Sequence, residues 1–347
     1  MTKKRIIGIV LVVIVLMLIL IILGLKWNNY KKVQNEKTQN GSSLATIRIG
    51  WQIPWAVEGQ LTQILKHTSL LSDNGLVGEF KGFSSGAPLN EAALAGDEDV
   101  IFTADQPAAT LLSKSSNWVI IGRLMYNRVS LYVPPLSPIK STSELKGKTV
   151  AIPFGTAAQK MTLGAEQSAG LNPQKDVKNI NLGIYEQSDM VRDPKATKWG
   201  NIDAMAGFDP TPSIFEDKGL VRNLQVGKVV SVIVMSKKFI NENPSAPVKF
   251  LKAFYGSYYF YRNNIDQANK WFIDESHLNI TPHALEISAS LEPNLDPTNK
   301  IIINFSDDDY KDFQDTADFI YAQKLINKPV IMKNYIDTSY VEQINNN

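Results

Sequence analysis

Short apolar strands and amphipathic helices alternate from Thr46 to Met235, and no other feature of the chain constrains its fold as strongly. Apolar runs bounded by turn residues predict strands at residues 46–50, 77–83, 100–103, 118–122, 129–133, 149–152, 180–184, 204–207 and 229–235. Helical periodicity predicts helices between them, at residues 58–66, 88–95, 106–113, 157–169, 186–193 and 212–217. This alternation predicts an α/β fold with a mostly parallel sheet covered by helices on both faces.

The last third of the chain has a different pattern, because helical segments follow one another without strands. Helices are predicted at residues 244–261, 265–276, 282–291 and 306–325. Ser306 precedes Asp307, Asp308 and Asp309, which is typical of an N-cap followed by acids in the first helical turn. The three aspartates could also form a metal cluster, but no further ligands follow at loop spacing. Capping is therefore the favoured interpretation.

The N-terminus carries the basic residues Lys3, Lys4 and Arg5, followed by twenty uncharged and largely apolar residues at positions 6–25. As a helix this run measures about 30 Å, which is enough to cross a bilayer. A cleaved signal peptide is the alternative, but the run is long for one and lacks small residues at a cleavage site. The polar residues 26–45 predict a disordered tether. The sequence thus predicts a single-pass anchor at residues 1–25 and an extracytoplasmic binding domain at the cell membrane.

Composition excludes several classes of function. With 347 residues the chain is long enough for two lobes, and a formal net charge of +2 gives no reason to expect nucleic acid as a partner. There is no cysteine, and the three histidines include no pair four residues apart, which argues against thiolate chemistry, a metal site or a catalytic triad. Gly147-Lys148-Thr149 ends like a phosphate-binding loop, but Thr142 stands where the first glycine is required. Binding without turnover, with no cofactor and no metal, is the favoured class.

The stretch from Leu145 to Ala158 predicts a turn, a strand, a second turn and a helix that opens at Thr156. A helix start leaves backbone amides without partners and directs the positive end of the helix dipole outward, which suits an anion. In open α/β sheets ligands bind outside the carboxyl ends of the strands, so polar and aromatic residues at those ends are candidates. The candidates for ligand binding are Trp51, Gln52, Trp55, Ser84, Ser85, Asp105, Gln106, Gly155, Thr156, Ala157 and Asp209.

Most of these candidates also have a purely structural interpretation. Ser84, Ser85 and Thr156 are natural helix N-caps. Asp105 and Asp209 each stand just before a proline-containing turn, where aspartate is common. The two tryptophans lie in a segment without a clean helical or strand period, so a core position and a cleft position are equally compatible with the sequence.

Several short motifs, in their order and spacing, resemble the nitrate, sulfonate and taurine group of substrate-binding proteins that serve ABC importers. The motifs are Ile47 to Gln52, Gly86 to Gly96, Asp99 to Pro107, Ser143 to Ala151, the Gly155-Thr156 turn, Ile202 to Pro210 and Tyr335 to Tyr340. The resemblance implies a type II periplasmic-binding-protein fold, in which two α/β lobes joined by two crossover strands close on the ligand. It implies residues 46–131 and 232–347 as lobe 1 and residues 132–231 as lobe 2. The implied partners are a small solute and the permease and ATPase of an importer, and we expect the protein to be a monomer.

By the same resemblance, the ligand-contacting positions fall at Trp51 and Gln52, Ser84 or Ser85, Asp105 and Gln106, Thr156 with its neighbouring amides, and Asp209. Two positions depart from the family pattern. Trp51 is bulky where a small residue is usual, and Asp105 places a carboxylate where an anion would approach. A zwitterion such as taurine, or an anion with an organic tail such as an alkanesulfonate, therefore fits better than a bare inorganic anion. Nitrate, bicarbonate and a pyrimidine precursor of thiamine stay open as solutes, and an enzyme of cofactor biosynthesis as an alternative function.

Overall fold

The computed structural model describes residues 44–345, and the chain divides into two units, Met1–Ala45 and Thr46–Asn347. The predicted membrane anchor at residues 1–25 and almost all of the predicted tether at residues 26–45 lie outside the described residues. Between residues 44 and 345, no helix combines the length and the apolar character needed to cross a membrane.

Strands and helices alternate up to Ser236, and in the described residues that follow there are only helices. The strands are β1 (Ala45–Gln52), β2 (Leu76–Phe83), β3 (Val100–Ala104), β4 (Trp118–Val133), β5 (Thr149–Ile152), β6 (Lys178–Asn181), β7 (Ala204–Phe208) and β8 (Arg222–Ser236). The α-helices are α2 (Glu58–His67), α3 (Leu70–Asp73), α4 (Gly86–Ala95), α5 (Asp105–Lys114), α6 (Ala157–Ser168), α7 (Ile184–Met190), α8 (Thr211–Asp217), α9 (Lys237–Glu242), α10 (Ala246–Asn263), α11 (Ile265–Ser276), α12 (Pro282–Ala289), α13 (Asp307–Ala322) and α14 (Ser339–Asn345). Short 3-10 helices are η1 (Thr142–Leu145), η2 (Pro293–Leu295) and η3 (Met332–Tyr335).

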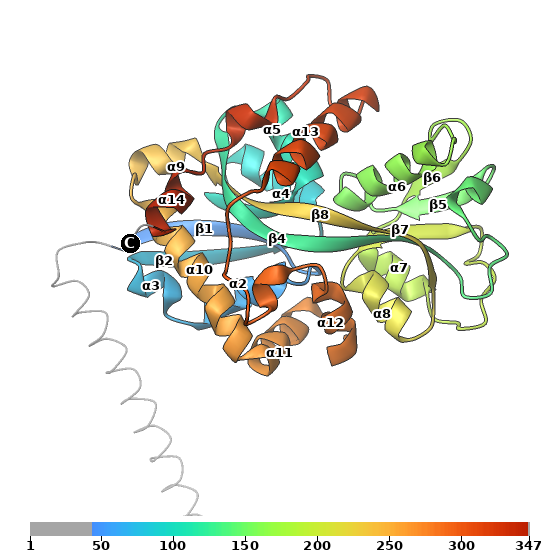
Figure 1. Cartoon of the computed structure of the whole chain (residues 1–347), viewed down its shortest axis with the longest axis horizontal. Coiled ribbons are helices and arrows are strands. Elements are labelled where there is room, and N and C mark those ends of the chain that lie inside the picture. Colours follow the sequence, from blue (N-terminus) through green and yellow to red (C-terminus); the bar gives the residue numbers. More distant parts are fainter. Residues whose placement is uncertain (1–43, 346–347) are drawn as a thin grey trace, which may run out of the picture. The chain divides into compact units, whose positions relative to one another are not determined.

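One eight-stranded sheet runs through the second unit in the order β2-β1-β3-β8-β4-β7-β5-β6. Strands β4 and β8 pair along their whole length, from Trp118 opposite Ser236 to Val133 opposite Arg222. At one end of this pair β8 also pairs with β3, and at the other end β4 also pairs with β7 (Figure 1). The β4–β8 pair therefore connects the strand group β2-β1-β3 with the strand group β7-β5-β6. The structure confirms the predicted α/β fold with two lobes and a helical C-terminal third.

Two features of the predicted sheet are wrong. The sheet is mixed, because β4 and β8 run antiparallel to each other and to their other neighbours, whereas β1, β5, β6 and β7 take part in parallel pairs. The strands predicted at residues 118–122 and 129–133 are two halves of the continuous strand β4, whose pairing with β8 shifts register at Ile120/Gly122, Arg123/Met125 and Leu131/Tyr132. Ile184 begins α7 instead of ending a strand, and the sequence pattern does not predict the short helices α3, α9 and α14.

Helix α13 covers the first lobe and begins with a capping box. Ser306 Oγ accepts a hydrogen bond from the Asp309 amide at 3.2 Å, and Asp309 Oδ2 accepts one from the Ser306 amide at 2.9 Å. This confirms the capping interpretation of the three aspartates. On the buried face of α13, Phe313 and Ile320 pack into one apolar core with Val232 of β8, and α13 lies against α5 (Figure 1).

The sheet of the second lobe carries an apolar cluster on each face, because successive side chains of a strand point to opposite sides. Leu131 and Val150 belong to one cluster, together with Ala165 of α6. Tyr132 and Ala151, their neighbours in the chain, belong to the other. Both faces are therefore covered, as expected for the interior part of an α/β sheet.

Helix α12 belongs to the C-terminal part of the chain but packs against the second lobe. Its residue Leu285 joins the apolar cluster that contains Phe215 of α8, and Figure 1 shows α12 beside α8. Thr281, the N-cap of α12, donates its hydroxyl to Asp217 Oδ2 at 2.6 Å. The chain thus returns to the second lobe after it has left that lobe through β8.

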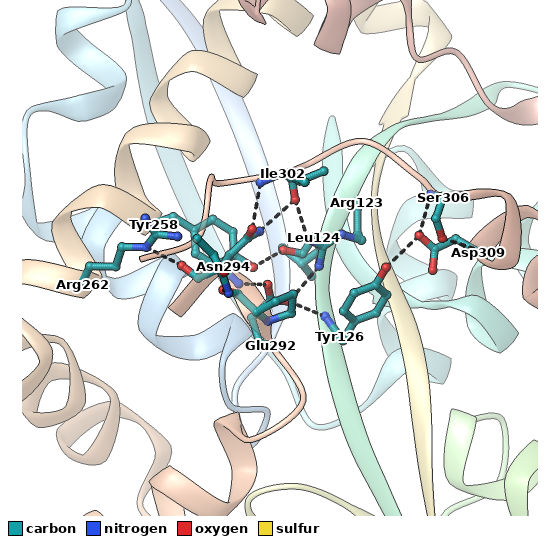
Figure 2. A network of polar contacts seen from close by, with 12 residues as sticks. Arg123, Leu124, Tyr126, Tyr258, Arg262, Glu292, Asn294, Ile302, Ser306 and Asp309 are labelled. Carbon is teal, nitrogen blue, oxygen red and sulfur yellow. Dashed lines mark hydrogen bonds and ion pairs between the residues drawn. The ribbon is translucent and has the colours of Figure 1, made fainter. Parts of the chain in front are cut away.

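A buried ion pair fixes the segment that follows α12 to β4 (Figure 2). Arg123 Nη1 lies 2.8 Å from Glu292 Oε2, and both side chains are almost completely buried. The same carboxylate oxygen accepts a hydrogen bond from the Tyr126 amide at 2.6 Å. The Tyr126 hydroxyl donates to Asp309 Oδ2 at 2.9 Å, so the network extends to the start of α13. The middle of β4 is therefore held by residues that lie far away in the sequence.

Candidate functional site

A cleft of about 330 Å³ lies between the two lobes at the carboxyl ends of several strands. Ser84 and Ser85, which follow β2, line it from the first lobe. Phe154, after β5, and Asn181, the last residue of β6, line it from the second lobe. The volume falls within the range of about 300–1,000 Å³ that is typical of ligand pockets, and open α/β sheets bind ligands at this edge.

Helix α6 begins next to this cleft, at the predicted residues Gly155, Thr156 and Ala157. Gly155 has a φ of +75°, and a Cβ built on it would lie 3.1 Å from the Cβ of Ala87, so the lobes approach each other closely here. The Thr156 hydroxyl donates to the Pro153 carbonyl at 2.7 Å, so it does not cap the helix. The amide of Ala157 has no intrahelical acceptor, because it belongs to the first turn. The positive end of α6 therefore lies beside the cleft.

Gln106 connects α5 of the first lobe with the first turn of α6. Its Nε2 donates to Gln159 Oε1 at 3.2 Å, and its Oε1 accepts the Lys160 amide at 2.9 Å. Gln159 Oε1 also accepts the Gly155 amide at 2.8 Å. Two backbone amides at the start of α6 are thus bound by glutamine side chains, and one of these side chains comes from the opposite lobe.

Asp105 is buried and already has partners. Its Oδ2 accepts the Thr316 hydroxyl at 2.7 Å and lies 3.5 Å from Lys160 Nζ of the opposite lobe. Its Oδ1 accepts the Gln106 amide at 2.7 Å. Asp105 therefore has an opposite charge within the protein, which Lys160 supplies. A cationic group on the solute is therefore no longer required by Asp105.

The end of β1 and the loop that follows it carry Trp51, Gln52 and Trp55, all of which are buried, with exposed fractions of 1%, 3% and 2%. The ring of Trp55 lies 5.7 Å from that of Phe208, at the end of β7 in the second lobe. Gln52 Nε2 and Trp55 Nε1 are buried and have no hydrogen-bond partner within residues 44–345. Buried donors are normally paired, so this loop can still donate two hydrogen bonds.

Asp209 follows β7 and is completely buried. Its Oδ1 accepts the Ser213 amide at 3.0 Å, and its Oδ2 lies 3.5 Å from Nη1 of Arg128 on β4. Burial raises the pKa of the Asp209 carboxyl to about 6, although Arg128 and the hydrogen bonds from Ser213 act in the opposite direction. The contacts of Asp209 hold the start of α8 on β4, and direct contact with a solute stays a prediction.

The structure brings the predicted residues into three neighbouring groups. The serines line the cleft, Asp105 and Gln106 contact the start of α6, and the tryptophan loop lies against the end of β7. The Ile53 amide donates to the Phe83 carbonyl at 2.9 Å, which places the tryptophan loop directly beside Ser84. Within residues 44–345 no three His, Asp or Glu side chains are grouped so that they could hold a metal ion.

Sequence reasoning missed four residues at this junction, namely Glu58, Asn127, Arg128 and Lys160. Asn127 donates to the Ala56 carbonyl, and Arg128 pairs with both Asp209 and Glu216. Two adjacent polar residues inside an apolar strand are a signal that could have identified Asn127 and Arg128. Glu58 and Lys160 carry no such signal, because charged residues on helices are usually exposed to solvent.

Comparison with known proteins identifies relatives of the chain. A model of the NMT1/THI5-like family matches residues 85–268, which is more than half of the chain. An aliphatic sulfonates-binding protein of Bacillus subtilis (strain 168) is 26% identical over 212 residues, which amount to 60% of this chain and 59% of that protein. The match thus spans about three-fifths of the length of this curated relative.

Solved structures share the fold. The alkanesulfonate-binding protein SsuA from Xanthomonas axonopodis pv. citri, bound to MOPS, has a TM-score of 0.69 and 21% identity, covering 85% of this chain and 99% of that chain. The periplasmic aliphatic sulphonate binding protein SsuA from Escherichia coli has a TM-score of 0.69 and 23% identity, covering 84% and 92%. The desulfurization enzyme DSZB has a TM-score of 0.60 and 13% identity, covering 87% and 99%. These likenesses confirm the predicted periplasmic-binding-protein fold, on which both binding proteins and an enzyme occur.

Proposed function

Because the chain belongs to the NMT1/THI5-like family, we propose that it is the solute-binding protein of an ABC importer and captures a small organic anion, such as an alkanesulfonate, between its lobes. One observation carries the proposal. The cleft of about 330 Å³ is lined by Phe154, just before α6, and by Ser84. The loop with the unpartnered donors of Gln52 and Trp55 lies next to Ser84, because the Ile53 amide binds the Phe83 carbonyl. Unpaired donors and a helix N-terminus favour an anion, and the alkanesulfonate-binding protein SsuA of Xanthomonas axonopodis pv. citri, which shares the fold, is bound to the sulfonate MOPS in its solved structure. Taurine, a zwitterion, stays within the proposed class.

The interactions available at the proposed site account for the micromolar affinity expected of a transport receptor. Each hydrogen bond to an ionised head group contributes about 1.5–3 kcal/mol, and the dipole of α6 contributes about 1 kcal/mol more. Micromolar affinity requires about 8 kcal/mol net of the cost of association. Three such bonds, together with burial of the organic tail between the lobes, are sufficient without covalent chemistry.

We place the binding domain on the extracytoplasmic face of the cell membrane, with residues 6–25 as a single-pass anchor. This part of the proposal rests on the basic and apolar N-terminal sequence. A tether formed by residues 26–45 would have a mean reach of about 25 Å. It would keep a monomeric receptor at raised effective concentration near its permease and ATPase.

We propose that the lobes close by bending at the middle of β4 and β8. The proposed division follows the one predicted from the sequence, with one change. Lobe 1 comprises residues 46–131 and 232–347 without helix α12, and lobe 2 comprises residues 132–231 together with α12. Helix α12 is assigned to lobe 2, because Leu285 packs into the apolar cluster of that lobe and Thr281 binds Asp217. The Gln106–Gln159 and Asp105–Lys160 contacts join the two lobes and would form on closure.

A panel of solutes tests the proposed function by thermal shift. We expect ethanesulfonate, MOPS and taurine to raise the melting temperature, since a ligand at 100 times its Kd stabilises the native state by about 2.7 kcal/mol. Nitrate and bicarbonate should stabilise less, because they fill only a small part of the cleft. If no compound of the panel, including a thiamine pyrimidine precursor, raised the melting temperature, the result would count against a transport receptor. Conversion of a bound compound, detected by mass spectrometry, would favour an enzyme.

Substitution of Gly155 by alanine is expected to weaken binding of the best panel compound about tenfold, because the new Cβ meets Ala87 across the cleft and overpacking costs about 1–3 kcal/mol. Gly147→Ala is the matched control. Gly147 has a φ of +73°, close to that of Gly155, but a Cβ there meets nothing within 4 Å. Both variants should lose stability, but only Gly155→Ala should raise Kd. An equal effect of the two variants on Kd would show that the contact with Ala87 is irrelevant to closure.

A further inference from the structure

A buried carboxyl group stands at the start of α2, next to the two unpartnered donors of the tryptophan loop. Glu58 is completely buried, and its Oε1 accepts the Gln52 amide at 2.6 Å. Its Oε2 is buried and has no partner within residues 44–345. Glu58 is therefore a polar group of the lobe junction whose second oxygen is not used by the fold.

Among residues 44–345, no cationic side chain pairs with Glu58. Strand β2 and helices α10 and α11 pack against α2, but the charged residue of α11 that reaches α2, Glu275, pairs with Lys66 at the far end. Tyr261 of α10 lies beside Gln60 of α2, and both side chains donate to Asn269 Oδ1. Burial raises the pKa of Glu58 well above its ordinary value, and the Gln52 amide opposes this effect. An unpaired buried carboxylate is far more costly than a neutral acid, so burial without a counter-charge favours the protonated form of Glu58.

The position of this proton follows from the hydrogen bonds. In the protonated form, Oε1 accepts the Gln52 amide, so the proton belongs on Oε2, the atom without a partner. The stretch from Gln52 to Glu58 then holds three buried donors that lack acceptors: Gln52 Nε2, Trp55 Nε1 and Glu58 Oε2. A sulfonate has three oxygens, and each of them can accept one of these bonds.

We propose that Glu58 is a further specificity-determining residue, which as a neutral acid donates a hydrogen bond from Oε2 to an oxyanion held together with Gln52 and Trp55. This inference rests on the proposed function, since it takes the solute to be an oxyanion. The three donors recognise the anionic head group and offer nothing to an amine. The site therefore selects organic oxyanions, and a cationic group on the solute adds no affinity at this loop.

The proposal has a defined pH dependence. The anion binds the form of the protein in which Glu58 is protonated, so affinity is highest at low pH. Above the pKa of Glu58 the proton must be taken up on binding, and affinity falls about tenfold for each pH unit. Replacement of Glu58 by glutamine keeps an acceptor for the Gln52 amide and a donor in place of Oε2, but removes the titration.

The first test needs no solute. In protein with ¹³C-labelled glutamate, the carboxyl signal that disappears in Glu58→Gln identifies Glu58. We expect this signal at the position of a protonated carboxyl at pH 7. An ionised Glu58 at this pH would overturn the donor assignment by itself, whatever the protein binds.

The second test measures ethanesulfonate affinity by calorimetry from pH 6 to one unit above the pH at which the ¹³C signal shows that Glu58 ionises. The wild type should bind more weakly as pH rises, Glu58→Gln should show no such trend, and Glu58→Leu should bind at least about tenfold more weakly at pH 6. Glu275→Gln, at the far end of α11, should keep the wild-type trend. A wild-type protein without a pH trend, or a trend that persists in Glu58→Gln, contradicts the inference. Failure of the wild type to bind ethanesulfonate at any pH overturns the proposed solute class and the donor role with it.

Discussion

Replacement of Glu292 by alanine is expected to lower the free energy of unfolding by about 3–5 kcal/mol, because it leaves a buried guanidinium without its counter-charge. Arg123 and Glu292 have side chains that are only 2% and 0% exposed, and their charged atoms lie 2.8 Å apart. The substitution also removes the acceptor of the Tyr126 amide. Urea denaturation of the full chain, followed by circular dichroism, measures the loss.

The matched control is Asp274→Ala on α11. Asp274 forms an ion pair of similar length with Lys270, at 2.7 Å, but these side chains are 60% and 67% exposed. Exposed pairs contribute about 0–1 kcal/mol, so this variant should remain close to the wild type. Equal losses of stability in the two variants would contradict the prediction. The buried Arg123–Glu292 pair would then not stabilise the attachment of the segment after α12 to β4.

The second large effect is expected for Phe272→Ala, with a loss of about 3–5 kcal/mol, which is usual for truncation of a buried phenylalanine. Phe272 lies on α11 and is completely buried. A Cβ built on Gly59 would lie 2.2 Å from its ring, so the ring rests directly on the backbone of α2. The same ring belongs to the apolar cluster of the second lobe, which includes Phe215 and Leu285.

Hydrogen exchange shows whether this cluster is one cooperative unit. Because Phe272 contributes to the cluster shared by α8 and α12, the amides of both helices should exchange faster in Phe272→Ala, together with those of α11. Tyr259→Ala is the control, since Tyr259 is 64% exposed on α10 and its loss should change stability by about 0.5 kcal/mol or less. Unchanged exchange in α12 would contradict the assignment of this helix to the second lobe.

The fold class was predictable because it depends on local patterns. Apolar runs and helical periodicity located most strands and helices, and the Ser306-to-Asp309 cap was identified correctly because capping involves residues three positions apart. The continuous course of β4 was not predictable. Arg123, Asn127 and Arg128 interrupt its apolar pattern, and their partners Glu292, Ala56 and Asp209 lie elsewhere in the chain.

The candidate site was predictable in its location and not in its pairings. Strand ends and a helix start indicated where Ser84, Ser85 and Gly155 would lie, and the structure places them at one cleft or next to it. The pairing of Asp105 with Lys160 was not visible, because their separation in the sequence carries no information about their distance across the lobes. Because of that pairing Asp105 does not require a cationic group on the solute, and both solute types favoured by the sequence, a zwitterion and an anion with an organic tail, remain in the proposed class.

The sequence by itself determined the features that depend on residues close together in the chain. These are the alternation of strands and helices, the start of α6, and the family resemblance of short motifs in order. Only the tertiary structure decided which charges are neutralised and which donors remain unpaired. Asp105 has a counter-charge because α6 of the opposite lobe brings Lys160 to it, whereas in the described part of the chain no charged side chain pairs with Glu58. Ionisation and hydrogen-bond capacity depend on burial and on distances between remote segments, and these exist only in the folded chain.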